Sequence, residues 1–99
     1  MYLIRDLMYC KPGKVKPMIE KFLAIKKMSE KNGMKMRIMT DVAGERYWTL
    51  VSEMEVESID KAMSMHGMSE DDMKEMEKVM KDYHDLVQNG RREIYKLEG

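Results

Sequence analysis

The chain has 99 residues, of which 43% are hydrophobic and 36% are charged, and its 18 basic residues balance its 18 acidic residues. This is the length of one small domain, so we expect residues 1–99 to form a single domain, and the apolar content is too high for a disordered chain. A balanced charge gives no general field for nucleic acid or an anionic membrane, so we expect neither as a partner.

The amino end and the cysteine content favour a cytoplasmic protein. Arg5 and Asp6 interrupt the first apolar residues, where a signal peptide needs an uncharged core. No run reaches the roughly 20 consecutive apolar residues of a membrane-spanning helix. The single cysteine, Cys10, cannot form an internal disulfide, which fits a reducing compartment, and we interpret it as a packing residue.

The first third of the chain reads as a strand followed by a helix. Apolar residues occupy both alternating faces of residues 2–9, which predicts a strand that needs cover on each face. Lys11-Pro12-Gly13 ends this strand, because proline has no backbone donor and glycine permits a turn. From about residue 15 to residue 31 the apolar residues recur with a helical period, and Asn32-Gly33 ends the helix.

The middle of the chain reads as two strands joined by a tight turn. The first of them covers residues 34–42, and the turn covers residues 43–45. The second covers residues 46–55, where Tyr47 and Trp48 contribute to the strongest β preference in the chain. We therefore expect these two strands to pair antiparallel.

Two helices and a last strand follow. Ser58 is placed to cap a short helix over residues 59–66. Ser69 is a stronger helix start, because three acidic residues follow it at the positive end of the helix dipole. The periodic pattern predicts that this longer helix runs to about residue 88, and residues 91–97 read as the last strand.

The order strand, helix, strand, strand, helix, strand predicts an α+β, ferredoxin-like fold, in which an antiparallel four-stranded sheet carries both helices on one face. Right-handed crossovers give the strand order 4-1-3-2. The second sheet face stays open, and it is too apolar to remain in water. A second copy of the chain is the simplest cover, so we predict a homodimer with facing sheets. The residues expected on this face include Leu3, Leu7, Tyr9, Tyr47, Val51 and Tyr95.

Several short segments resemble a known superfamily. The first strand ends in Tyr9-Cys10-Lys11-Pro12-Gly13, the hairpin contains Thr40-Asp41-Val42-Ala43-Gly44, the third strand has an acidic end at residues 53–57, and the chain closes with Arg92-Glu93-Ile94-Tyr95. With the order of elements, these segments resemble the dimeric α+β barrel superfamily, and within it the NIPSNAP-like and antibiotic-biosynthesis-monooxygenase-like proteins. The resemblance covers nearly the whole chain and implies a dimeric barrel. Members share a fold more than an activity, so it implies no single reaction.

The candidate binding site is a pocket between the helices and the sheet, or inside the dimer barrel. The sequence does not identify catalytic residues. The candidate lining residues are Trp48, Tyr47 and Tyr95 as walls and Arg5, Arg37, Asp41, Glu53 or His66 as polar contacts. The alternative is that the aromatic residues are core and dimer contacts and that the charges pair across the sheet.

Neither a cofactor nor a metal is expected. Haem-degrading relatives within the superfamily use an asparagine on the first strand with a tryptophan and a histidine; this chain has Trp48 and His66 but lacks that asparagine. Among the fourteen methionines, Met34-x-Met36 and Met63-x-Met65-x-x-Met68 have spacings that can hold a soft ion such as Cu(I). With one cysteine in the chain, we favour methionine as adaptable core filler.

Two functions remain open. The first is a dimeric domain that binds or oxidises a small apolar or aromatic molecule in its pocket. The second is a non-catalytic structural or interaction module that only dimerises, with a pocket too small for a ligand and filled by methionine side chains. These residues leave open both an enzyme and a protein without catalytic activity.

Overall fold

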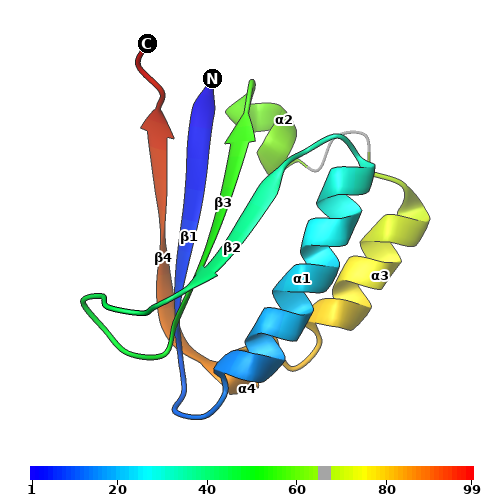
Figure 1. Cartoon of the computed structure of the whole chain (residues 1–99). Helices are drawn as coiled ribbons and strands as arrows, with labels where there is room; N and C mark the ends of the chain where they lie inside the picture. Colours follow the sequence, from blue (N-terminus) through cyan, green and yellow to red (C-terminus); the bar gives the residue numbers. More distant parts are fainter. Residues whose placement is uncertain (65–67) are drawn as a thin grey trace.

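The computed structural model describes residues 1–64 and 68–99 and confirms the predicted α+β arrangement (Figure 1). In chain order the elements are β1 (Tyr2–Cys10), α1 (Val15–Lys31), β2 (Met36–Thr40), β3 (Thr49–Val56), α2 (Ile59–Met63), α3 (Glu70–Met80), α4 (Tyr83–Leu86) and β4 (Val87–Lys96). None of these helices combines the length and the apolar character needed to cross a bilayer.

The four strands form one antiparallel sheet in the order β2-β3-β1-β4, which is the predicted strand order. The central strands are β1 and β3, and β2 and β4 form the two edges. Figure 1 shows α1 and α3 side by side over one face of this sheet. The other face carries no helix of the described residues, and we call it the open face.

Alternation along the strands assigns each side chain to one of the two faces. Met8 and Cys10 of β1 share a buried core with Leu50 of β3 and with Met18 and Phe22 of α1, so the even-numbered residues face the helices. Burial raises the pKa of the Cys10 thiol, as expected for a packing residue. The odd-numbered residues lie on the open face: Leu3, Arg5, Leu7, Tyr9, Arg37, Met39, Thr49, Val51, Glu53, Glu55, Arg91, Glu93 and Tyr95.

The hairpin differs from its prediction, because a loop over residues 41–48 replaces the expected three-residue turn. The Asp41 carboxylate accepts a hydrogen bond from the Thr49 backbone N–H at 2.8 Å, which closes the loop. Trp48 has a φ of 61°, in the left-handed region, so it ends the loop and does not belong to β3. Tyr47 is 85% exposed and does not lie on the sheet face where it was expected.

The helix predicted over residues 69–88 is also wrong at its end. The helix α3 ends at Met80, and Asp82 has a φ of 67°, which breaks the helical path before the single turn of α4. The strand β4 then begins at Val87, four residues earlier than expected. Gly90 lies in β4 opposite Met8, where a Cβ would come 2.7 Å from the Leu7 carbonyl oxygen.

The short helix α2 begins as predicted. The Ser58 side chain accepts a hydrogen bond from the Lys61 backbone N–H, which is the predicted N-cap. The described helix covers Ile59–Met63. The expected continuation to residue 66, including the candidate site residue His66, lies outside the described residues.

Candidate functional site

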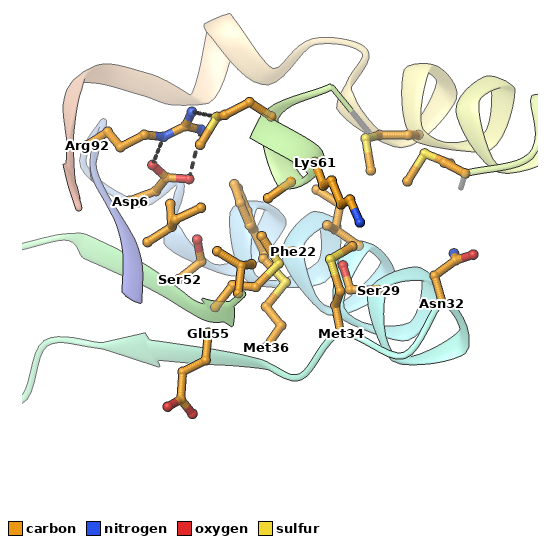
Figure 2. Close-up of a pocket in the computed structure, with 18 of the residues that line it drawn as sticks. Asp6, Phe22, Ser29, Asn32, Met34, Met36, Ser52, Glu55, Lys61 and Arg92 are labelled. Atoms are coloured by element: carbon orange, nitrogen blue, oxygen red, sulfur yellow. Dashed lines mark hydrogen bonds and ion pairs between the residues drawn. The ribbon is translucent and has the colours of Figure 1, made fainter. Parts of the chain in front are cut away.

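A cavity of about 1060 Å³ lies between the helices and the helix-bearing face of the sheet (Figure 2). Strands, α1, α2 and α3 all contribute to its wall. The apolar residues of that wall include Ile4, Met8, Met36, Met54 and Val56 from the sheet, Phe22 and Ile25 from α1, Ala62 and Met63 from α2, and Met76 and Met80 from α3. The site is therefore a largely apolar space inside one protomer.

Methionine dominates this wall. Nine of the fourteen methionines line the cavity: Met1, Met8, Met34, Met36, Met54, Met63, Met68, Met76 and Met80. Fully buried Met18 is core filler, as the sequence led us to expect, but most of the methionines border open space instead. Thioether side chains are flexible and polarisable, so such a wall can adapt to apolar ligands of different shapes. In the described part of the chain, no group of three or more His, Cys, Asp or Glu side chains is arranged to hold a metal ion.

An ion pair lies among the polar residues of the cavity wall. The carboxylate of Asp6 on β1 accepts hydrogen bonds from Nε and Nη2 of Arg92 on β4, at 2.6 and 3.2 Å. The hydrogen bond to Asp6 raises the pKa of the Arg92 guanidinium, so Arg92 stays charged. The side chains of Asp6 and Arg92 are 27% and 50% exposed, which places the pair at the rim of the cavity.

Tyr83 and Ser52 add hydroxyl groups to the wall. Tyr83 packs against Phe22, with ring centroids 6.5 Å apart. Burial raises the pKa of Tyr83, and the negative charge of Asp6 acts in the same direction. The Tyr83 hydroxyl therefore stays protonated and can donate a hydrogen bond to a ligand.

Several sequence candidates meet on the open face, away from this cavity. Glu53 joins Arg5 and Arg37 through two contacts of 2.6 Å each, and Arg5 also lies 3.6 Å from Glu93. The Arg5 guanidinium lies over the Tyr95 ring, 5.4 Å from its centroid. The expected pairing of charges across the sheet is thus present, as a row of alternating charge across all four strands.

The loop over residues 41–48 holds the other candidates, Asp41, Tyr47 and Trp48. The described lining of the cavity includes neither these residues nor Arg5, Arg37, Glu53 and Tyr95, so the structure does not place the named pocket candidates between sheet and helices. That these candidate residues contribute to a dimer barrel stays a prediction. His66 lies outside the described residues.

Sequence reasoning missed Asp6, Arg92, Ser52 and Tyr83 as site residues. Arg5 and Asp6 were noticed only as interruptions of an apolar strand. Neighbouring residues of a strand point to opposite faces, so one of the two charges had to face the helices and needed a partner there. That Arg92 is the partner of Asp6 can be known only from the strand register, which sets Asp6 of β1 opposite Arg92 of β4.

No protein-family model and no curated protein sequence matches this chain. The chain does match solved structures. An uncharacterised NIPSNAP domain protein from Burkholderia xenovorans matches with a TM-score of 0.77 at 10% identity, over 100% of this chain and 96% of its own. A candidate antibiotic biosynthesis monooxygenase from Nitrosomonas europaea matches with a TM-score of 0.76 at 14% identity, over 100% of both chains. A NIPSNAP family protein from Agrobacterium tumefaciens matches with a TM-score of 0.72 at 14% identity, over 98% of this chain and 92% of its own.

Such low identities establish a shared fold and no shared activity. They confirm the resemblance drawn from the sequence at the level of fold. The chain has the ferredoxin-like α+β fold of NIPSNAP domain proteins and of proteins named as antibiotic biosynthesis monooxygenases.

Proposed function

We propose that this protein binds a small apolar or aromatic molecule in the cavity between its sheet and its helices. The observation that carries the proposal is the methionine-lined cavity of about 1060 Å³. Ligand sites typically have volumes of about 300–1,000 Å³, with mostly apolar walls and a few convergent polar groups. The Asp6–Arg92 pair and the Tyr83 hydroxyl are such polar groups.

Oxidation of the bound molecule is the reaction that we propose to test first. Its support is limited to the fold, since some proteins of this fold are named as monooxygenases. The apolar wall of the cavity suits the binding of an apolar substrate for such chemistry. The proposal assigns no catalytic residue.

We also propose that two copies of the chain pair through the open face. On this face Tyr95 is 46% exposed and Met39 is 38% exposed, while Leu7 and Val51 are half-buried. Tyr9 is already 9% exposed in the protomer, where the Arg46 guanidinium covers its ring at 4.3 Å from the centroid. A second open face would bury the apolar residues that remain exposed.

A module that only dimerises is the alternative function. It predicts a pocket that methionine side chains fill completely. The size of the cavity supports ligand binding over this alternative, because nine methionines border the space and leave it open.

Filling the cavity tests the proposal. Ser52→Phe places an aromatic ring on the helix-bearing face of β3, where Ser52 is 3% exposed and lines the cavity. We expect the variant to lose at least tenfold in affinity for N-phenyl-1-naphthylamine, a neutral dye that fluoresces in apolar sites, because the ring occupies the ligand's space. Fluorescence titration measures the affinity, and circular dichroism verifies the fold.

The matched control is Val51→Phe, which adds bulk to the neighbouring residue of β3 on the open face. This variant should bind the dye as the wild type does. Ala62→Phe is a second cavity variant, because it adds bulk to the same cavity from α2 and leaves the residues of the sheet unchanged. A wild-type protein that takes up no dye, or a dye affinity that neither cavity variant changes, would refute binding in this cavity.

A further inference from the structure

Arg92 has one guanidinium nitrogen that only a weak acceptor satisfies among the described residues. Its Nε and Nη2 atoms donate to Asp6, whereas its Nη1 atom contacts the Met63 sulfur at 3.0 Å. All three residues line the cavity, and Figure 2 shows Asp6 and Arg92 facing each other at its wall. A guanidinium donates a stronger hydrogen bond to oxygen than to a thioether. A ligand oxygen would therefore accept a stronger hydrogen bond from this nitrogen than the Met63 sulfur does.

The charges around Nη1 of Arg92 decide whether a charged or an uncharged ligand oxygen suits this position. Asp6 already neutralises Arg92, so the pair as a whole carries no net charge. The other charged side chains of the described lining are those of Glu55, Glu57, Lys61 and Arg91, two acidic and two basic. Figure 2 shows Glu55 pointing away from the cavity, and Arg91 lies 3.4 Å from Glu93 of the open face, which leaves one acid and one base.

Because acidic and basic side chains balance around the cavity, a carboxylate ligand would gain little electrostatic attraction there. It would lose its hydration in an apolar cavity and would approach the negative charge of Asp6. A hydrocarbon would leave Nη1 of Arg92 with its sulfur contact and would gain no hydrogen bond. An uncharged carbonyl oxygen avoids both penalties, because it accepts a hydrogen bond without bringing a charge into the cavity.

We propose that Nη1 of Arg92 binds an uncharged carbonyl oxygen, so that the cavity takes apolar ketones, esters or amides in preference to carboxylates and hydrocarbons. This inference rests on the binding function proposed above and names its ligand class. Asp6 is a positioning residue in it, because its two hydrogen bonds fix the guanidinium plane and its charge excludes anions. In this structure the Met63 sulfur occupies the place proposed for the ligand oxygen.

Three probes with one aromatic ring system test this preference on the wild-type protein. They are the fluorescent ketone prodan, the same dimethylaminonaphthalene ring with a carboxylate in place of the ketone, and the ring without an acyl group. We expect prodan to bind about tenfold more tightly than the ring alone, the factor expected for one charge-assisted hydrogen bond. The carboxylate should bind no more tightly than the ring alone.

Two variants then assign the preference to the ion pair. Arg92→Lys should lose about tenfold in prodan affinity with little change for the ring alone, because lysine cannot hold Asp6 through two nitrogens and donate a third fixed hydrogen bond. Asp6→Asn leaves the positive charge of Arg92 unbalanced and should turn the preference toward the carboxylate probe. Arg46→Lys is the matched control, since Arg46 stacks on Tyr9, and Tyr9 faces away from the cavity.

The outcomes separate this inference from the function on which it rests. If the ring alone binds the wild type as tightly as prodan, or if the carboxylate binds most tightly, the ligand class is wrong while the cavity remains a binding site. If prodan is preferred but Arg92→Lys and Arg46→Lys affect it equally, Arg92 is not the contact. If none of the three probes binds, the proposed function fails together with the inference.

Discussion

Glu53 is an acidic residue of the open face whose carboxylate is contacted by two arginines. Its side chain is 8% exposed, and its two oxygens contact Arg5 and Arg37 at 2.6 Å each. Burial alone would raise the pKa of the Glu53 carboxyl, but the hydrogen bonds from the two arginines outweigh burial and lower its pKa. Because the folded state lowers this pKa, the stabilisation is complete above the pKa of an unfolded glutamate and is lost as the pH falls through the folded value.

Glu53→Gln should therefore destabilise the protein at neutral pH and much less in acid. We expect a loss of about 1–2 kcal/mol near pH 7, at the lower end for a charged pair because the side chain of Arg37 is 65% exposed. At an acid pH below the lowered pKa of folded Glu53, protonation removes the charge from the wild-type residue as well, so the two proteins should approach each other in stability. Urea unfolding at both pH values measures the difference.

Glu93→Gln is the control for this prediction. Glu93 belongs to the same row of charges, but its side chain is 26% exposed and lies 3.6 Å from Arg5. At neutral pH, Glu93→Gln should therefore lower the free energy of unfolding less than Glu53→Gln does. Equal costs for the two variants, or a cost for Glu53→Gln that does not change with pH, would contradict the assigned role of Glu53.

At the scale of residues the sequence predicts kinds of contact better than it predicts places. It led us to expect that charges pair across the sheet, and Arg5, Arg37 and Glu53 do so. It placed Trp48 in the third strand because tryptophan favours strands, yet a left-handed backbone at this position keeps Trp48 out of β3. The identity of Asp6 as a cavity residue required the register of β1 with β4, which a single sequence does not contain.

The helix α3 is attached to α1 at both of its ends. At its first turn, Asp72 contacts Lys31 at 3.3 Å and Asn32 at 3.2 Å. At its last turn, Lys21 Nζ donates to the carbonyl oxygens of Val79 at 2.7 Å and Lys81 at 2.6 Å. These carbonyl groups lack helical partners, and a lysine also suits the negative end of the helix dipole.

Lys21→Met should remove this attachment while keeping the apolar stem of the side chain. We expect a loss of about 1–2 kcal/mol in the free energy of unfolding, the value of the two hydrogen bonds to a charged donor after exchange with water. Urea denaturation measures this loss. Lys27→Met, at an exposed position of α1, is the control and should change stability by less than about 0.5 kcal/mol. If the two variants behave alike, Lys21 does not stabilise the end of α3.

At the scale of elements the sequence predicts type and order correctly and misplaces two sets of boundaries, those of the hairpin loop and the end of α3. Period and capping residues locate α1, the Ser69 cap of α3 and the four strands. The helical spacing of Met76, Met80, Tyr83 and Val87 continues beyond the true end of α3, so it predicted a helix that is too long. Pairing of Val87 with Cys10 of β1 overrides this local pattern, and a contact so distant in the chain leaves no local signal.

At the scale of the whole molecule the sheet separates the cavity from the open face. Its even-numbered side chains form most of the sheet's contribution to the cavity wall, and its odd-numbered side chains form the open face. The proposed ligand site lies within one protomer, whereas the proposed dimer uses the other side of the same strands. The two proposed functions should therefore be separable by changes at neighbouring residues of β3.

Val51→Lys tests that separation. Val51 lies on the open face between Leu7 of β1 and Met39 of β2, and a lysine there can reach water in a monomer but would put a charge into a dimer interface. We expect native mass spectrometry to show a dimer for the wild type and a monomer for the variant, because two such lysines oppose the pairing. Both proteins should bind N-phenyl-1-naphthylamine with similar affinity, since the cavity is complete in one protomer. A monomeric wild type would refute the dimer, a dimeric variant would locate the dimer contact elsewhere, and loss of dye binding together with the dimer would show that the cavity depends on the partner subunit.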